Sequence, residues 1–323
     1  MKILCYPVLA AFMCFANAAH AQSTTYPERP IKLVVPWPAG GGTDAVSRHV
    51  AAAVSQQLKQ QVIVDNRPGA NGIVGTEALA RALPNGYTLG IATAETHAIN
   101  PHVYKKLSYN AQKDFTAIAW VGHFPYALAT RPDLGVSDAA GLVALARKQP
   151  GKLSYASWGV GSSSQIAFEM FKQAAKVDML HVPFQGAAPA LTALAANQVD
   201  VLMVPLSVAL PQRQGGRLNL LGLAAPKRLP AAPDLPTLIE QGFPVEGGTW
   251  LAVMGPAGLP SSVVNQLNRA VNTALDTTDL RDTLIKLGVE PFGAQPNEVQ
   301  KRIEAESQRW SAVIRTAGVQ LEQ

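Results

Sequence analysis

The sequence Ile31-Lys-Leu-Val-Val35 is followed directly by Pro36-Trp-Pro-Ala-Gly-Gly-Gly-Thr-Asp44 and by a helical pattern that ends near Leu58. The apolar run is typical of a buried strand, and Thr43 or Asp44 can cap the start of the helix. The glycines between them allow a sharp turn and a close approach of the backbone to another group. A strand, a glycine loop and a helix in this order begin a β-α-β unit, which predicts an α/β fold.

The alternation of strand and helix continues on the C-terminal side of this stretch. A strand at 62–65 is followed by a helix at 73–83 and, after the turn Pro84-Asn-Gly86, by a strand at 87–93. This β-α-β-α-β order predicts a mainly parallel sheet with helices on both of its faces.

A second series of strands and helices follows from about residue 116. Two strands are expected at 116–121 and 126–130, joined around Gly122 to Pro125. The remaining expected strands are at 152–157, 180–184, 199–204, 218–224 and 249–254, and the helices are at 137–150, 163–175, 187–196, 261–275, 279–287 and 296–317.

Two crossings of the chain, near 122–125 and near 225–230, divide the sequence into lobes. Lobe 1 is expected to contain 22–124 plus 227–323, and lobe 2 to contain 125–226. A chain that leaves the first lobe, builds a second and returns makes a double-crossing hinge, whose cleft collects loops from both lobes.

The first 21 residues have the features of a secretory signal peptide. Lys2 precedes an apolar run at 3–15, and Ala19-His-Ala21 supplies the small residues of a cleavage site before Gln22. The mature chain is therefore expected in the periplasm, with a buried N-terminal helix as the alternative. Both cysteines, Cys5 and Cys14, lie in the segment to be removed, so the mature chain has no thiol for a disulfide, a nucleophile or a metal. A lipid anchor at Cys14 is disfavoured by the bulky residues before it.

The formal net charge is +5 and is not concentrated in one segment. No basic run with interleaved aromatic residues points to nucleic acid, and a general positive field attracts small anions. The histidines have neither the spacing of metal ligands nor the motif of a catalytic triad. The sequence therefore predicts no catalytic residue, no metal and no cofactor.

The first glycine loop has the properties of an anion site. Its free N–H groups and the positive end of the following helix suit a carboxylate as well as a phosphate. A tight turn closed by a helix cap is the alternative. The candidate ligand-binding residues here are Trp37, Pro38, Ala39, Gly40, Gly41, Thr43 and Asp44.

The same loop also matches a dinucleotide fingerprint. Gly40-x-Gly42-x-x-Ala45 follows a strand, opens a helix and has Asp65 about 20 residues further on. Pro36 and Pro38, however, stand where the fingerprint runs straight from strand to glycine, and export would separate the protein from the cytosolic NAD pool. An NAD-dependent oxidoreductase, or another exported enzyme, is kept as the alternative function.

A second glycine- and serine-rich loop, Trp158-Gly-Val-Gly-Ser-Ser-Ser-Gln165, also connects a strand to a helix. Its hydroxyl and N–H groups can hold a polar end of a ligand. The alternative is an N-cap serine that this helix needs in any case. No G-x-S-x-G elbow is present, which argues against a serine hydrolase. The candidate residues are Gly161, Ser162, Ser163 and Gln165.

An ordered series of motifs resembles the substrate-binding proteins of tripartite tricarboxylate transporters, the Bug/TctC-like extracytoplasmic receptors. The resemblance covers essentially the whole mature chain. The motifs are Tyr26-Pro-x-Arg-Pro30, Val35 to Asp44, Asn66-Arg-Pro-Gly-Ala-Asn-Gly72, Pro84-Asn-Gly-Tyr-Thr-Leu89, Asn100-Pro101, Asp114-Phe115, Gly159-x-Gly-Ser-Ser163, Val182-Pro-Phe-Gln-Gly186 with Pro189-Ala190, and Pro236-Thr-Leu-x-Glu240 before Trp250.

The resemblance implies a two-lobed periplasmic-binding-protein fold of type II-like architecture, with a mainly parallel sheet flanked by helices in each lobe. It implies that a ligand carboxylate is gripped by the loops at 38–44 and 161–163 through backbone N–H groups and waters. By position, the segments Thr93–Thr96, which includes Glu95, and Phe184–Gly186 would complete the cleft. The implied partners are membrane subunits of a transporter, or a membrane sensor, and the receptor is expected to be monomeric.

Two departures from the family pattern, and two tryptophans beside the loops, bear on the ligand. Gln165 stands where the family often has histidine, and Val204-Pro205 replaces a stretch that often carries an acidic residue. The missing acid weakens the case for a ligand with an ammonium group. Trp37 and Trp158 flank the two loops and could form a flat wall for an aromatic acid, or could equally belong to the core.

Overall fold

A ten-stranded sheet runs through the computed structural model, which describes residues 26–319, and its main strand order is β2-β1-β3-β9-β4-β7-β5-β6. Two further strands, β8 and β10, also pair with β4. The strands are β1 (Ile31–Val35), β2 (Val62–Asn66), β3 (Thr88–Ala92), β4 (Phe115–Thr130), β5 (Ser154–Ser157), β6 (Leu180–Pro183), β7 (Val201–Pro205), β8 (Asn219–Ala224), β9 (Gly248–Pro256) and β10 (Glu290–Pro291).

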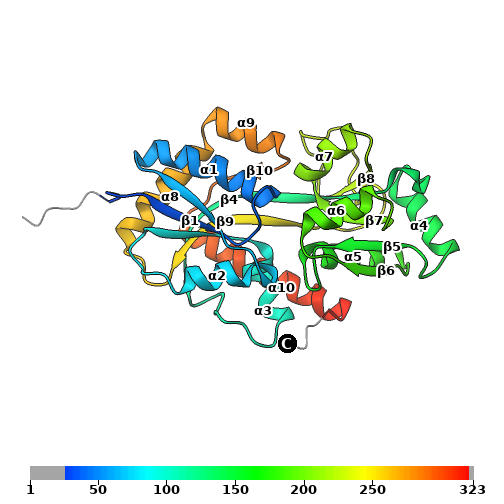
Figure 1. Cartoon of the computed structure of the whole chain (residues 1–323), viewed down its shortest axis with the longest axis horizontal. Helices are drawn as coiled ribbons and strands as arrows, with labels where there is room; N and C mark the ends of the chain where they lie inside the picture. Colours follow the sequence, from blue (N-terminus) through cyan, green and yellow to red (C-terminus); the bar gives the residue numbers. More distant parts are fainter. Residues whose placement is uncertain (1–25, 320–323) are drawn as a thin grey trace, which may run out of the picture.

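Helices cover both faces of the sheet (Figure 1). They are α1 (Gly42–Leu58), α2 (Ile73–Ala80), α3 (Asn100–Val103), α4 (Ala139–Lys148), α5 (Ser163–Ala175), α6 (Ala187–Ala195), α7 (Leu206–Gln214), α8 (Ser261–Leu275), α9 (Thr278–Lys286) and α10 (Pro296–Ala317). Three short turns are η1 (Ala70–Gly72), η2 (Glu95–Ile99) and η3 (Pro132–Leu134), of which η2 is π-helical.

The molecule has two lobes, one on each side of the middle of β4 (Figure 1). Lobe 1 contains β1, which pairs in parallel with β2 and β3, and lobe 2 contains β5, which pairs in parallel with β6 and β7. The antiparallel strands β4 and β9 run through the centre of the sheet. The predicted mainly parallel, two-lobed α/β fold is therefore confirmed.

Strand β4 corrects the expected pair of strands at 116–121 and 126–130. It is one strand of 16 residues, which pairs with β9 as far as Pro125 and with β7 and β8 from Tyr126 onward. Two irregularities in its register with β9 allow it to bend without ending. Gly122 is needed for close packing, since a Cβ there would lie 2.6 Å from the Glu290 carbonyl oxygen. The glycine and proline at 122 and 125 therefore mark a bend and a close approach, whereas the sequence suggested a loop.

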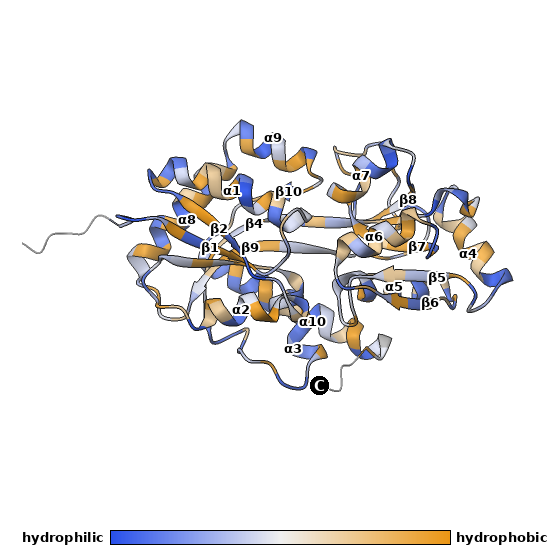
Figure 2. Cartoon of the chain, in the orientation of Figure 1, coloured by the Kyte–Doolittle hydropathy of each residue, from blue (hydrophilic) through white to orange (hydrophobic). Residues whose placement is uncertain are grey.

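Each lobe has its own apolar core on both faces of the sheet. In Figure 2 the surrounding helices carry both orange and blue segments, as expected of amphipathic helices that face the sheet on one side. Leu229 and Leu235 pack in a cluster with the strands of lobe 2, and Val245 packs in the other lobe 2 cluster. The chain after β8 thus stays against lobe 2 until it reaches β9.

Two helical segments were not expected from the sequence. Pro211 lies inside α7, where proline normally argues against a helix because it lacks an N–H donor. The residues after β3 form η2 and α3, where the sequence analysis assigned no element. No helix between residues 26 and 319 combines the length and apolarity that a membrane crossing requires. The predicted signal peptide lies outside the described residues.

Candidate ligand-binding site

The first glycine loop leaves the carboxyl end of β1 and is shaped by a buried carboxylate. Asp44 is 3% exposed, and its Oδ2 accepts hydrogen bonds from the Gly40 N–H (2.9 Å) and Arg48 Nε (3.0 Å). Its Oδ1 accepts from Asn66 Nδ2 (2.8 Å), which also donates to the Trp37 carbonyl oxygen (3.1 Å). The side chain of Asp44 therefore holds the loop in shape from within.

Electrostatics keep Asp44 in its charged form. Burial alone would raise the pKa of Asp44, but hydrogen bonds from Arg48, Gly40 and Asn66 hold this pKa below its usual value. Helix α1 begins at Gly42, and its N-cap residue, Gly41, makes no side-chain capping bond. Pro38, Ala39 and Gly40 are exposed. The start of α1 thus offers backbone donors beside a solvent-accessible loop.

The second loop leaves the carboxyl end of β5 and is stabilised by its own side chains. Ser162 is the N-cap of α5, where its Oγ accepts from the Gln165 N–H (3.4 Å) and donates to the Gly159 carbonyl oxygen (2.6 Å). Gln165 Oε1 accepts from the Gly161 N–H (2.7 Å). The capping role that the sequence offered as the alternative is present, and Gln165 holds the loop where the family often has histidine.

The two loops approach each other across η1. Asn71 Nδ2 donates to the Gly161 carbonyl oxygen (3.4 Å) in lobe 2 and to Asn100 Oδ1 (2.8 Å) in lobe 1. The neighbouring residue, Gly72, lies against the first loop, since a Cβ on it would be 3.6 Å from Trp37 Cζ2. The structure therefore brings both predicted loops to the same junction between the lobes.

Glu95 lies in this junction at 2% exposure and bonds to both lobes. Its Oε1 accepts from Ser163 Oγ of lobe 2, and its Oε2 accepts from Thr249 Oγ1 (3.1 Å) on β9. Ser163 Oγ also lies 2.5 Å from the Tyr126 hydroxyl. Burial and the negative charge of Glu95 together raise the pKa of Tyr126 well above its usual value. Both carboxylate oxygens of Glu95 are thus engaged by hydroxyl groups.

The remaining predicted residues are Thr93, Phe184 and Gly186. Thr93 follows β3, is fully buried and donates its N–H to Thr96 Oγ1 (3.0 Å), while its own Oγ1 has no partner among the described residues. Phe184 donates its N–H to the Ser157 carbonyl oxygen (2.9 Å), beside the second loop. Gly186 caps α6 at a φ of 113°, a conformation that favours glycine.

The two flanking tryptophans are half-buried. Trp37 packs against the core of lobe 1, and Trp158 packs against that of lobe 2, edge-on to Tyr126 with ring centroids 5.4 Å apart. The Trp37 indole Nε1 is buried without a partner in the described part of the chain. Each ring therefore contributes to its core, and an aromatic ligand wall stays a prediction.

Several residues at this junction were not predicted. Tyr126 and Thr249 lie within strands, where nothing in the sequence separates them from core residues, and Asn71 stands in a quoted motif without an assigned role. Ser207 also reaches this junction, since a Cβ on Gly42 would lie 3.0 Å from its Oγ. It could have been found, because it follows the carboxyl end of β7 as Trp158 follows that of β5. Ligands in open α/β sheets bind at such ends.

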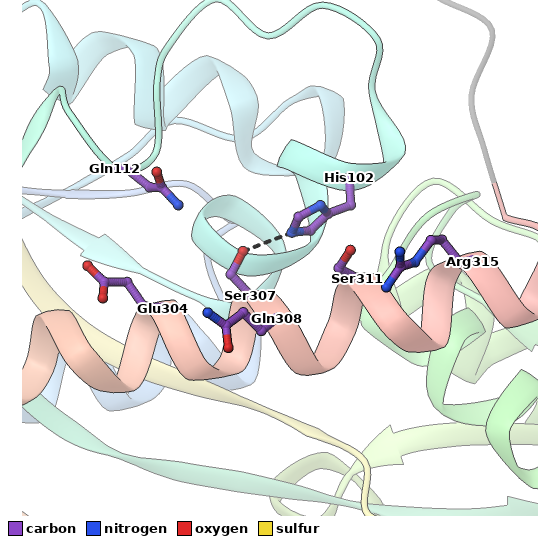
Figure 3. A pocket seen from close by; sticks show the side chains of 7 residues that line it. All are labelled: His102, Gln112, Glu304, Ser307, Gln308, Ser311 and Arg315. Atoms are coloured by element: carbon purple, nitrogen blue, oxygen red, sulfur yellow. Dashed lines mark hydrogen bonds between the residues drawn. The ribbon is translucent and has the colours of Figure 1, made fainter.

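A surface hollow of about 390 Å³ lies elsewhere, between α3 and α10 (Figure 3). His102 from α3 and Ser307 from α10 meet across it, with 2.8 Å between Nε2 and Oγ. Burial, together with the charge of Arg315, lowers the pKa of His102 and so favours a neutral imidazole. The hollow is lined by His102, Gln112, Glu304, Ser307, Gln308, Ser311 and Arg315, and includes none of the predicted site residues.

Between residues 26 and 319 no cluster of three or more histidine, cysteine, aspartate or glutamate side chains could hold a metal ion.

Residues 46–319 match the family described as tripartite tricarboxylate transporter family receptor. Protein BugT of Bordetella pertussis is 31% identical over 317 residues, which cover 97% of each chain.

Two solved structures of similar proteins contain a carboxylate. The R. palustris protein Rpa4515 with adipate is 34% identical, has a TM-score of 0.88, and the match covers 91% of this chain and 99% of that one. MatC from Rhodopseudomonas palustris with bound malate is 32% identical, has a TM-score of 0.81, and the match covers 90% and 100%.

Proposed function

Because this chain belongs to the tripartite tricarboxylate transporter family of receptors, we propose that it captures a small carboxylate at the junction between its two lobes. Adipate and malate, found in two similar structures, are both small dicarboxylates. The chain is a receptor and not an enzyme, and the NAD-dependent reading of the glycine loop finds no support among its relatives.

One observation carries the proposal: two strand-to-helix loops from opposite lobes converge, and the first opens a helix that has no side-chain cap. Backbone N–H groups at a helix start bind a carboxylate through both hydrogen bonds and the helix dipole. The residues proposed to surround the ligand are Trp37, Pro38, Ala39, Gly40, Gly41, Thr43, Asp44, Thr93, Glu95, Gly161, Ser162, Ser163, Gln165, Phe184 and Gly186. Asp44 and Gln165 act in this proposal by fixing the backbone of the two loops, and Glu95 acts by holding the hydroxyl groups of Ser163 and Thr249.

Binding is proposed to close the lobes about β4 and β9. Donors from both lobes reach the ligand together only in the closed arrangement, so the ligand stabilises that arrangement by its differential affinity. Residues 125–226 are assigned to lobe 2 in this proposal. The packing of Leu229 and Val245 supports extending lobe 2 to the start of β9.

Export and partners complete the proposal. Cleavage of a signal peptide near Ala21–Gln22 would release a monomeric receptor into the periplasm, where membrane transporter subunits, or a membrane sensor, would recognise the closed form. N-terminal sequencing of the periplasmic protein and its elution volume in gel filtration test these points. A mature chain that begins at Met1 or a stable dimer would contradict them.

The ligand is tested by native mass spectrometry and a thermal-shift screen of mono-, di- and tricarboxylates and aromatic acids. An acid that co-purifies, or that raises the melting temperature saturably, supports the proposal. The variant Gly41→Asp places a carboxylate at the N-cap of α1, where it can cap the helix and compete with the ligand. We expect a stable protein that has lost its response to acids.

A matched control is available for this substitution. Gly215 is exposed and has the same φ of −80° as Gly41, so Gly215→Asp introduces the same charge away from the junction. Its acid response should equal that of the wild type. Equal binding by the Gly41→Asp and Gly215→Asp variants would refute the placement of the ligand at α1.

A further inference from the structure

The starts of α1 and α7 face each other across the lobes. In Figure 1 the dark-blue beginning of α1 points toward α7. A Cβ built on Gly42, the first residue of α1, would lie 3.0 Å from Ser207 Oγ in α7 and 3.8 Å from Phe124 Cε1. Ser207 is therefore the lobe 2 side chain that approaches the start of α1.

The hydroxyl of Ser207 is buried without a hydrogen-bond partner among the described residues. Burial removes the hydroxyl from its hydrogen bonds with water, and no protein group within residues 26–319 replaces them. An unsatisfied buried hydroxyl of this kind costs free energy. Trp37 Nε1 and Thr93 Oγ1 are in the same condition, and both border the junction between the lobes. A ligand at the junction can supply the missing partner of such groups.

Ser207 is held in this position by a loop of lobe 1. Gly288 has a φ of +73°, and a Cβ on it would lie 3.2 Å from the Ser207 backbone nitrogen and 3.1 Å from Leu206 Cβ. The positive φ and these short distances favour glycine at position 288, where the loop packs closely on the start of α7. The hydroxyl is thus positioned by contacts that do not depend on a ligand.

We propose that Ser207 Oγ donates a hydrogen bond to the ligand carboxylate held at the start of α1. This inference rests on the proposed function and adds to it a specific contact from lobe 2. The carboxylate would then receive backbone donors from lobe 1 and a hydroxyl donor from lobe 2. Because the hydroxyl is already in position before the ligand arrives, its loss should act mainly on the dissociation rate.

Calorimetric titration with adipate and with malate tests the contact in the variants Ser207→Ala and Ser207→Cys. Loss of one hydrogen bond to a charged group should raise Kd by about 10- to 100-fold in Ser207→Ala, with Ser207→Cys in between because a thiol is a weaker donor. Ser262→Ala, an exposed serine on α8, is the control and should bind as the wild type does.

A double-mutant cycle tests the geometry without any ligand. Gly42→Ala should destabilise the wild type in urea, because the new methyl group meets Ser207 Oγ, but should cost less in the Ser207→Ala background. Additive effects would show that the two residues do not meet, and would overturn the inference.

The outcomes separate the two proposals. If the wild type binds an acid and Ser207→Ala binds it equally well, the Ser207 contact is wrong and the receptor function stands. If the wild type binds no carboxylate, both fail. A raised Kd in Ser207→Ala, an unchanged Kd in Ser262→Ala and non-additive stabilities would together establish the contact.

Discussion

Replacing Ser163 with alanine should weaken the link between the lobes. Ser163 Oγ of lobe 2 donates to the buried Glu95 carboxylate of lobe 1 and lies 2.5 Å from the Tyr126 hydroxyl. The variant leaves Glu95 with the hydrogen bond from Thr249. A hydrogen bond to a charged group contributes about 1.5–3 kcal/mol. Since each 1.4 kcal/mol is about a factor of ten, the ratio of closed to open molecules should fall by roughly 10- to 100-fold.

Small-angle scattering measures this change directly. Ligand-free Ser163→Ala should have a larger radius of gyration than the wild type, and a carboxylate ligand should restore the smaller value. The apparent Kd should rise by up to the same factor, because only the closed fraction holds the ligand fully.

The neighbouring serine supplies the control for this experiment. Ser164 Oγ donates to the Met203 carbonyl oxygen (2.6 Å) inside lobe 2, so Ser164→Ala should lower stability without opening the lobes. If Ser163→Ala and Ser164→Ala have the same radius and the same Kd, the hydrogen bond to Glu95 does not contribute to closure.

Two further predictions concern acidity and ligand class. Burial lowers the pKa of His97 to about 3, so the unfolded chain binds a proton below its pKa of 6.5 while the folded chain does not. Stability should therefore fall as the pH drops, by about 2 kcal/mol from this group at pH 5, and urea unfolding of His97→Gln should show a shallower pH dependence. Malate should bind more tightly than aspartate by calorimetry, because both oxygens of Asp44 and of Glu95 already accept hydrogen bonds. Tighter binding of aspartate would refute this argument.

The α/β class and most elements could be predicted because strand and helix periodicities are local. The run Ile31–Val35 and the helix after it are examples, since their burial pattern follows directly from the spacing of apolar residues. Strand β4 was divided in the prediction because glycine and proline carry the same local signal in a turn and in a bent strand. Helix α7 was not predicted for a similar reason, because a proline such as Pro211 usually indicates that a helix is absent or ends.

The candidate site could be predicted only in part. Loops that follow strands and are rich in glycine indicated where a ligand would lie, and the structure brings them together. No motif indicated that Glu95 bonds to Ser163, since these residues are 68 positions apart. Contacts of this kind depend on how the lobes face each other, which no local pattern encodes.

The continuous course of β4 has a mechanical consequence. Its residues up to Pro125 are in register with β9, and the next residue, Tyr126, donates its N–H to the Gly247 carbonyl oxygen. The two connections between the lobes therefore form a hydrogen-bonded ribbon at the point where they cross. Motion of one lobe against the other has to twist the paired strands β4 and β9 elastically. The hydrogen bonds between these strands then favour a return to the original arrangement. Proteases cut flexible linkers more readily than hydrogen-bonded strands, so β4 should resist cleavage. The lobes should therefore remain joined through many cycles of ligand binding and release.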